Sequence, residues 1–131
     1  MAFDPGRTIG VAHWYPEQGE WDAWQTKDPF EALEWVRRKI FNYPMSPFSL
    51  TVEKYAGGGY KTNDGIYTTE LVGFFKYYFE FYFATKVRLP LSQQRLSGLE
   101  TATKWAKSMD IEGPHSWDAL AHTIVDAREY E

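Results

Sequence analysis

The chain has 131 residues, 44% of them hydrophobic and 18% aromatic, and its formal net charge is −4. This length predicts one domain with one core, and the absence of cysteine excludes disulfides and thiolate metal sites. The acidic balance argues weakly against a nucleic-acid partner, although a cluster of metal-binding carboxylates would itself produce such an excess. No basic leader followed by an apolar stretch and no apolar run long enough to span a bilayer is visible, so we expect a soluble, cytoplasmic protein.

The N-terminal segment predicts strands. Residues Ala2–Trp14 are strand-like but are interrupted by Pro5-Gly6, a pair typical of a bulge or tight bend, which would hold Asp4 at the bend. Charged or polar residues alternate with apolar ones over Glu20–Thr26, which predicts a second, half-exposed strand. The two would form a hairpin through Pro16 to Gly19.

A helix and another strand are predicted next. Asp28-Pro29 is a helix-start signature, and apolar residues at helical spacing follow it until Asn42-Tyr43-Pro44 ends the helix. The run Phe48–Tyr55 is strand-like and carries Glu53 near its C-terminal end. A carboxylate at that position would face the open edge of a sheet.

Three consecutive glycines open a loop that we expect to extend from Gly57 to Gly65. The following segment, Thr68–Phe83, is helical in composition and aromatic in nearly every direction. Such a helix must be covered on both sides. A homodimer interface would cover the side away from the sheet, whereas ordinary core accounts for the other half of the helix.

The C-terminal third predicts a strand over Lys86–Leu91, a helix over Ser97–Met109 and a last helix from Gly113-Pro114 to Arg128. Three residues separate His115 from Asp118 in that last helix, so both side chains lie on one face. The alternation of strands and helices predicts an α/β fold.

Three carboxylates stand at positions that an α/β sheet brings to one edge, namely Asp4, Glu53 and Asp118. Together with His115 they would form a site for one or two Mg²⁺ ions, with Mn²⁺ as a substitute. Phosphodiester hydrolysis is the reaction we expect there. One ion would activate the attacking water and the other would stabilise the leaving 3′ oxygen.

Three motifs resemble the RuvC-like branch of the RNase H-like nuclease superfamily, particularly its short members from bacteriophages. Phe3-Asp4-Pro5-Gly6 resembles the family's opening strand, Leu50-Thr51-Val52-Glu53 its strand-borne glutamate, and His115-Ser116-Trp117-Asp118-Ala119 its closing helix. Each motif alone is common. Asp-Pro-Gly by itself would be a plain surface turn, and Glu53 by itself would be a solvated strand residue. Their order and spacing carry the resemblance, which spans nearly the whole chain.

The resemblance implies a single RNase H-like domain over residues 1–131, a mixed β-sheet flanked by α-helices, in which the usual three-stranded meander is shortened. It implies a DNA endonuclease that resolves four-way (Holliday) junctions, as in DNA recombination and repair. The enzyme would act as a homodimer joined through the helix after the glutamate strand, with Mg²⁺ and symmetric nicking. Alternatives with this fold are cleavage of flaps or RNA/DNA hybrids, and a binding module without catalysis.

Basic and aromatic residues near these motifs are candidates for DNA binding, although most surface Lys and Arg residues only increase solubility. The candidates are Arg7, Lys54, Tyr55, Tyr60, Lys61 and Arg95. Lys54 and Lys61 bracket the glycine loop, where a basic segment with two tyrosines would fit a distorted strand, or else simply be disordered. We expect His122, one turn beyond Asp118, to pack or hydrogen-bond in the core and exclude it from the site.

Overall fold

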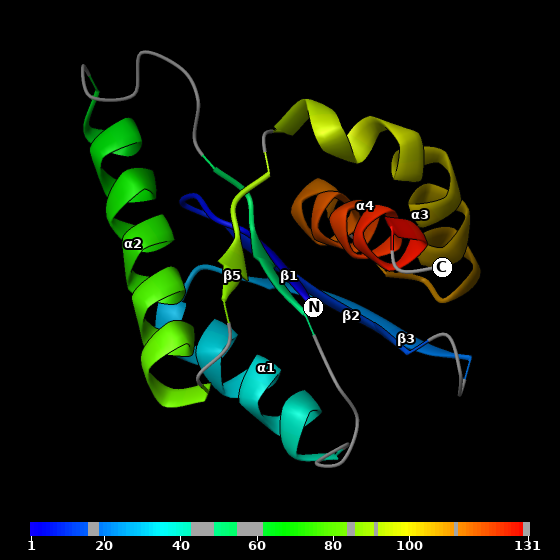
Figure 1. Ribbon diagram of the computed structural model, residues 1–131. Coiled ribbons are helices and arrows are strands. Elements are labelled where there is room, and N and C mark those ends of the chain that lie inside the picture. The colour runs from blue at the N-terminus through cyan, green and yellow to red at the C-terminus, as the bar shows by residue number, and fades with distance from the viewer. Residues whose placement is uncertain are drawn as a thin grey trace.

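The computed structural model describes residues 1–15, 19–42, 49–54, 62–83, 86–90, 92–111 and 113–129. These residues form an α/β fold, a five-stranded mixed sheet with helices on both faces (Figure 1). The strands are β1 (Ala2–Asp4), β2 (Ile9–Tyr15), β3 (Glu20–Thr26), β4 (Leu50–Val52) and β5 (Val87–Arg88). The helices are α1 (Pro29–Asn42), α2 (Asn63–Phe83), α3 (Leu96–Ser108) and α4 (Pro114–Glu129), and the 3₁₀ helix η2 (Ser92–Arg95) leads into α3.

The strands lie in the order β3-β2-β1-β4-β5. The first three pair antiparallel in chain order, whereas β4 is parallel to β1 and β5 is parallel to β4. Parallel neighbours need a long crossover connection, and α2 lies in the connection between β4 and β5. Because β1 and β4 run in the same direction, their carboxyl ends meet at one edge of the sheet.

The opening segment differs from the expected single strand in two halves. It forms two separate strands, β1 and β2, which pair antiparallel with Phe3 opposite Val11. Pro5 cannot donate a ladder hydrogen bond and Gly6 accepts a tight bend, so the chain reverses here instead of bulging. With β3 the three-stranded meander is complete, and the expectation of a shortened meander is wrong.

One face of the sheet is covered by α1 and α2 (Figure 1). As predicted, Asp28 caps α1, and its carboxylate accepts a hydrogen bond from the backbone N of Phe30 at 2.9 Å. The ring of Phe3 stacks on Phe75 of α2 with centroids 4.4 Å apart, so the central strand packs directly on this helix. Further fully buried members of this core are Ile9, Val11, Val36, Leu50, Val52 and Phe79.

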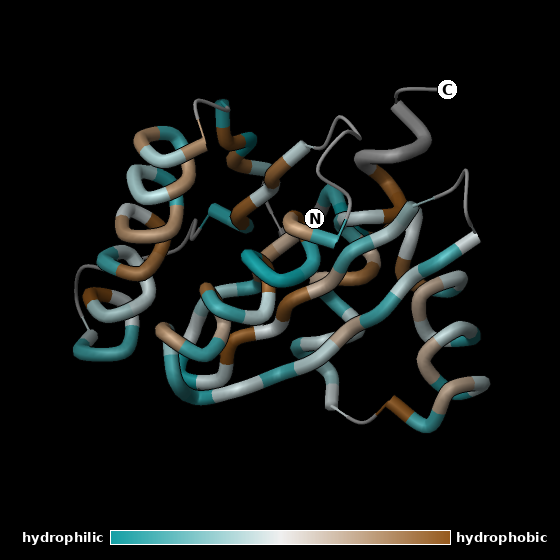
Figure 2. Tube along the Cα trace, turned by 90° about the horizontal axis from the view of Figure 1, so that it is seen from below, coloured by the Kyte–Doolittle hydropathy of each residue, from teal (hydrophilic) through white to brown (hydrophobic). Residues whose placement is uncertain are grey.

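Helix α2 starts five residues before the predicted helix and includes Gly65, which we expected in the loop. The hydroxyl of Thr62 accepts a hydrogen bond from the backbone N of Gly65 at 3.0 Å and so caps the helix start. Hydrophobic residues recur along α2, the helix at the left of Figure 2. None of the described helices is both long and apolar enough to cross a membrane.

The strand β3 has the bounds predicted for it, Glu20–Thr26, whereas the strands that follow it are shorter in the described residues than predicted. Of the predicted strand Phe48–Tyr55, the structure describes residues 49–54, and the strand β4 covers three of them. Phe48 and Tyr55 lie outside the described residues. In the described part of the predicted strand Lys86–Leu91, which excludes Leu91, only the two residues of β5 form a strand. The hairpin residues Pro16 to Gln18 also lie outside the described residues.

The opposite face of the sheet is covered by α4, with α3 packed against α4 (Figure 1). The core on this face consists largely of small side chains, which let the helices approach the sheet closely. Its buried members are Ala12, Ala23, Ala102, Ala119, Leu120, Ala121 and Ile124. Trp105 of α3 stacks on Trp21 of β3 at 5.4 Å and closes the edge of this core. The sheet therefore separates two cores of different character.

Candidate active site

Two carboxylates stand at neighbouring strand ends. Asp4 is the last residue of β1, and Glu53 directly follows β4, in which Val52 lies opposite Phe3. The backbone N of Glu53 donates to the carbonyl of Phe3 at 3.0 Å, which holds the two strand ends at the same level. Because side chains alternate along a strand, Phe3 and Val52 point into the core under α1 and α2. The carboxylates of Asp4 and Glu53 therefore point to the α4 side.

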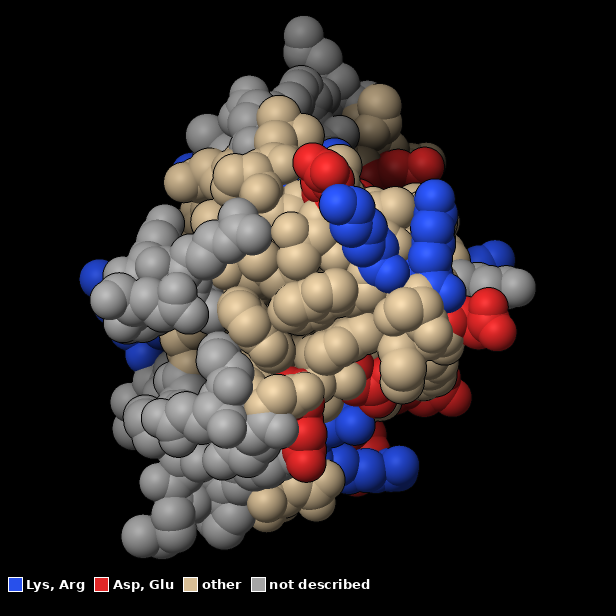
Figure 3. Space-filling model, turned by 90° about the vertical axis from the view of Figure 1, so that its right-hand side faces the viewer, with Lys and Arg blue, Asp and Glu red and all other residues tan. Residues whose placement is uncertain are grey.

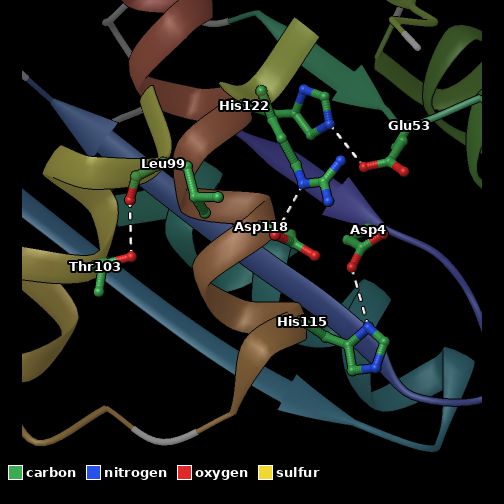
Figure 4. Close-up of polar contacts among 8 residues, drawn as sticks. Asp4, Glu53, Leu99, Thr103, His115, Asp118 and His122 are labelled. Carbon is green, nitrogen blue, oxygen red and sulfur yellow. Dashed lines mark hydrogen bonds and ion pairs between the residues drawn. The ribbon is translucent and has the colours of Figure 1, made fainter. Parts of the chain in front are cut away.

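Helix α4 brings His115 and Asp118 to this edge, one helical turn apart (Figure 4). The Nδ1 atom of His115 lies 3.1 Å from Oδ2 of Asp4. This approach depends on a glycine in β2, since a Cβ at Gly10 would stand 1.9 Å from the carbonyl oxygen of His115. Gly10 thus sets the height of α4 above the sheet, and with it the contact between His115 and Asp4.

The charges at this edge act on one another. Burial raises the pKa of Asp4, and the negative charges of Glu53 and Asp118 raise it further, against the hydrogen bond from His115. The hydrogen bond to Asp4 raises the pKa of His115, and the three carboxylates favour its cationic form further, against burial. The three predicted carboxylates are therefore close enough to repel one another, and the cluster requires positive charge nearby.

Arg95, the last residue of η2, supplies positive charge to the cluster. Its Nε donates to Oδ1 of Asp118 at 2.9 Å, and both side chains are about three-quarters buried. Burial lowers the pKa of Arg95, but the hydrogen bond to Asp118 and the charges of all three carboxylates outweigh burial and raise it. The residue that we selected as a phosphate contact thus lies against a candidate metal ligand.

His122, which the sequence analysis left out of the site, contacts one of the three carboxylates. Its Nε2 lies 2.8 Å from Oε2 of Glu53, and its side chain is 2% exposed (Figure 4). The hydrogen bond expected for His122 is present, but its partner, Glu53, was not predicted. A signal was present, because His115, Asp118 and His122 follow the i, i+3, i+7 spacing of one helix face.

Each carboxylate uses one oxygen in these contacts, namely Oδ2 of Asp4, Oε2 of Glu53 and Oδ1 of Asp118. The second oxygen of each is left for another ligand. Carboxylate oxygens are the donors that Mg²⁺ and Mn²⁺ prefer, so the chemistry of the donor set fits such an ion. Within the described ranges, however, no three His, Asp or Glu side chains already stand at metal-binding spacing. The carboxylates are instead paired with His115, Arg95 and His122.

The other candidates for DNA binding are only partly visible. Arg7 pairs with Asp64 of α2 at 2.8 Å and lies over the ring of Tyr67 at 4.2 Å. Lys54 is exposed beside Glu53, and its backbone N donates to the carbonyl of Pro90. Tyr55, Tyr60 and Lys61 lie outside the described residues.

The surface on the α3 side carries mixed charge. In Figure 3, which faces the right-hand side of Figure 1, Lys and Arg side chains lie beside Asp and Glu side chains. On α3 itself, Lys104 pairs with Glu100 at 3.3 Å, and both side chains are exposed. Of the basic residues that the structure describes, Arg95 is the one with a printed contact to the carboxylate cluster.

Comparison of the chain with models of protein families, with curated proteins and with solved structures found no match.

Proposed function

We propose that this protein is a metal-dependent endonuclease of the RNase H-like superfamily that cuts branched DNA, with the four-way junction as its substrate. The observation that carries the proposal is the convergence of Asp4, Glu53 and Asp118 from β1, from the end of β4 and from α4. The complete antiparallel meander supports the same superfamily, because the resemblance of the motifs implies it.

Asp4, Glu53, Asp118 and His115 would hold Mg²⁺ or Mn²⁺. In phosphodiester hydrolysis such ions supply activation of the attacking water and stabilisation of the leaving oxygen. The chain's own residues orient the ligands: His115 holds one oxygen of Asp4 and Arg95 holds one of Asp118. Arg95 and the exposed Lys54 are placed to bind phosphates of a strand that enters the cluster.

Homodimerisation is part of the proposal, since symmetric nicking needs two sites. The outer side of α2 exposes several aromatic rings, which form a continuous surface with a ring of α1. Phe30 of α1 contacts Phe74, and the row continues through Tyr78 and Tyr82 to Phe81, with centroids of successive rings 4.7 to 6.3 Å apart. Exposed apolar surface of this kind marks interaction sites. We call this row the α1/α2 aromatic surface.

A cleavage assay on matched substrates tests the proposal. The protein would be incubated with Mg²⁺ and a fixed four-way junction, a linear duplex or an RNA/DNA hybrid of the same sequence. We expect paired, symmetric nicks in the junction alone. Asp118→Asn is expected to fold and bind the junction but not to cut it, because one metal-binding oxygen is lost. Cleavage by this variant would remove Asp118 from the mechanism.

A second candidate function is supported by the pairing within the cluster. Because all three carboxylates already have a histidine or arginine partner, the site is also compatible with an RNase H-like module that binds nucleic acid without cutting it. Junction binding without cleavage in either Mg²⁺ or Mn²⁺ would establish this module. Cleavage of the hybrid, or equal cleavage of all three substrates, would instead contradict junction selectivity.

A further inference from the structure

We propose that His122 is a positioning residue that fixes the carboxylate of Glu53 for metal binding. The inference rests on the proposed nuclease function and concerns a residue that neither the motifs nor the carboxylate set includes. Besides His115 and Asp118, helix α4 would then contribute His122 to the site. His122 lies one turn beyond Asp118 and acts through the side chain of Glu53.

The contact has the geometry of a fixed hydrogen bond. The Nε2 atom of His122 donates to Oε2 of Glu53 at 2.8 Å, with the His122 side chain 2% exposed and the Glu53 side chain 16% exposed. A glutamate at the end of a short strand has three side-chain torsions to restrain, and a buried donor removes much of that freedom. With Oε2 held by His122, Oε1 is the carboxylate oxygen left for a metal ion.

The attachment of α4 to the sheet does not depend on His122. Leu120 and Ile124 are fully buried between α4 and the strands, and the carbonyl of His115 sits directly over Gly10. These contacts hold the helix independently of the imidazole. Loss of His122 should therefore release Glu53 while Asp118 stays in place.

His122 also lines a cavity of about 210 Å³. The other residues that line this cavity are Thr51, Arg88, Leu89, Pro90, Gln94 and Val125. A smaller side chain at position 122 would join this space to the carboxylate of Glu53. A free imidazole molecule would then have room to enter and replace the lost donor.

The first test measures Mn²⁺ affinity by calorimetry, so the readout does not depend on cleavage. We expect His122→Leu to bind Mn²⁺ 10- to 100-fold more weakly than the wild type, as is usual when a residue that orients a metal ligand is lost. His122→Gln keeps an amide donor and should recover most of that affinity. Thr123→Val is the matched control, because it removes a buried hydroxyl of α4 whose partner among the described residues is the carbonyl of Ala119. It should bind Mn²⁺ as the wild type does.

A second test covers the case in which the leucine variant does not fold. His122→Ala with a few millimolar imidazole should recover Mn²⁺ affinity, whereas imidazole should not increase the affinity of the wild type. Wild-type affinity in His122→Leu or His122→Ala, or no recovery with glutamine or imidazole, overturns the positioning role. If the wild-type protein neither binds Mn²⁺ nor cuts DNA, the proposed function itself fails, and the role of His122 with it.

Discussion

At the scale of single residues, the contact between Arg95 and Asp118 would govern the proposed binding of a metal by the cluster. The guanidinium lies 2.9 Å from a carboxylate oxygen and feels the charge of all three carboxylates. A divalent cation at the same carboxylates would repel this charge and compete with it for Asp118. Arg95 is therefore the internal counter-ion of the metal-free cluster.

We expect Arg95→Gln to bind Mn²⁺ about tenfold more tightly than the wild type in the absence of DNA, because a nearby positive charge is removed. The same variant should bind the junction more weakly, because a phosphate contact is lost. Calorimetry with Mn²⁺ and fluorescence titration with a labelled junction measure the two effects. Arg38→Gln serves as the control, because it removes an equal charge from α1, where Arg38 pairs with Glu34 among the residues that the structure describes. An unchanged or weaker Mn²⁺ affinity would refute competition.

The sequence predicted the carboxylates of the site better than their partners. Asp4, Glu53 and Asp118 could be selected because strand ends and helix faces have fixed periods, and those periods survive folding. The partners depend on which side chains meet across elements. For His122 the sequence predicted packing or a hydrogen bond in the core but no partner. The position of Glu53 relative to α4 is set by the pairing of β4 with β1, which local patterns do not contain.

At the scale of elements, most helices and the strand β3 were predicted closely, whereas the opening strand and β4 were not. The bounds of α1 follow from a capping residue and an apolar stripe, both local signals. The reversal at Pro5-Gly6 is instead decided by the pairing of β1 with β2, and one interrupted strand has nearly the same local pattern as two paired strands. The early start of α2 depends on Thr62, because its hydroxyl accepts a hydrogen bond from the backbone N of Gly65, which has no carbonyl partner within the first turn of the helix.

The α1/α2 aromatic surface gives a prediction at this scale. Phe81 is 80% exposed on α2. We expect the wild type to be a dimer at micromolar concentration. Phe81→Glu should raise the dissociation constant of the dimer at least tenfold, because two-fold symmetry places two new charges in one interface. Light scattering with size-exclusion chromatography measures the mass.

The control for that experiment is Met109→Glu. Met109 is 63% exposed at the end of α3, on the other side of the sheet, so the same change there should leave the dimer intact. Both variants should keep the wild-type melting temperature within a few degrees, since exposed substitutions change stability little. A monomeric wild type would refute dimerisation through this surface.

At the scale of the whole molecule, the stability of the fold should depend on His13. This side chain is 3% exposed, packs near the rings of Tyr15 and Trp35, and has an Nδ1 without a hydrogen-bond partner among the described residues. Burial, together with the charge of Lys39, lowers the pKa of His13 from 6.5 to about 4. The folded state therefore favours the neutral imidazole more than the unfolded state does.

Because the folded pKa lies below the unfolded one, the stabilisation is complete above pH 6.5 and is lost as the pH falls toward 4. We expect the protonation of His13 alone to lower the free energy of unfolding by roughly 3 kcal/mol between pH 6.5 and pH 4. Urea unfolding of the wild type and of His13→Leu at several pH values measures this loss of stability. The contributions of all other titrating groups cancel in the difference between the two curves of unfolding free energy against pH. Parallel curves from pH 7 to pH 4 would disprove the effect.

The two cores on opposite sides of the sheet have a geometric consequence for the proposed dimer. The aromatic surface lies beyond one core, and the carboxylates face the other. If two copies join through α2, both sheets and both α1/α2 layers stand between the two catalytic clusters, which then open away from each other. The separation of the two cuts becomes a fixed dimension of the protein, so a junction has to adjust its arms to reach both clusters at once.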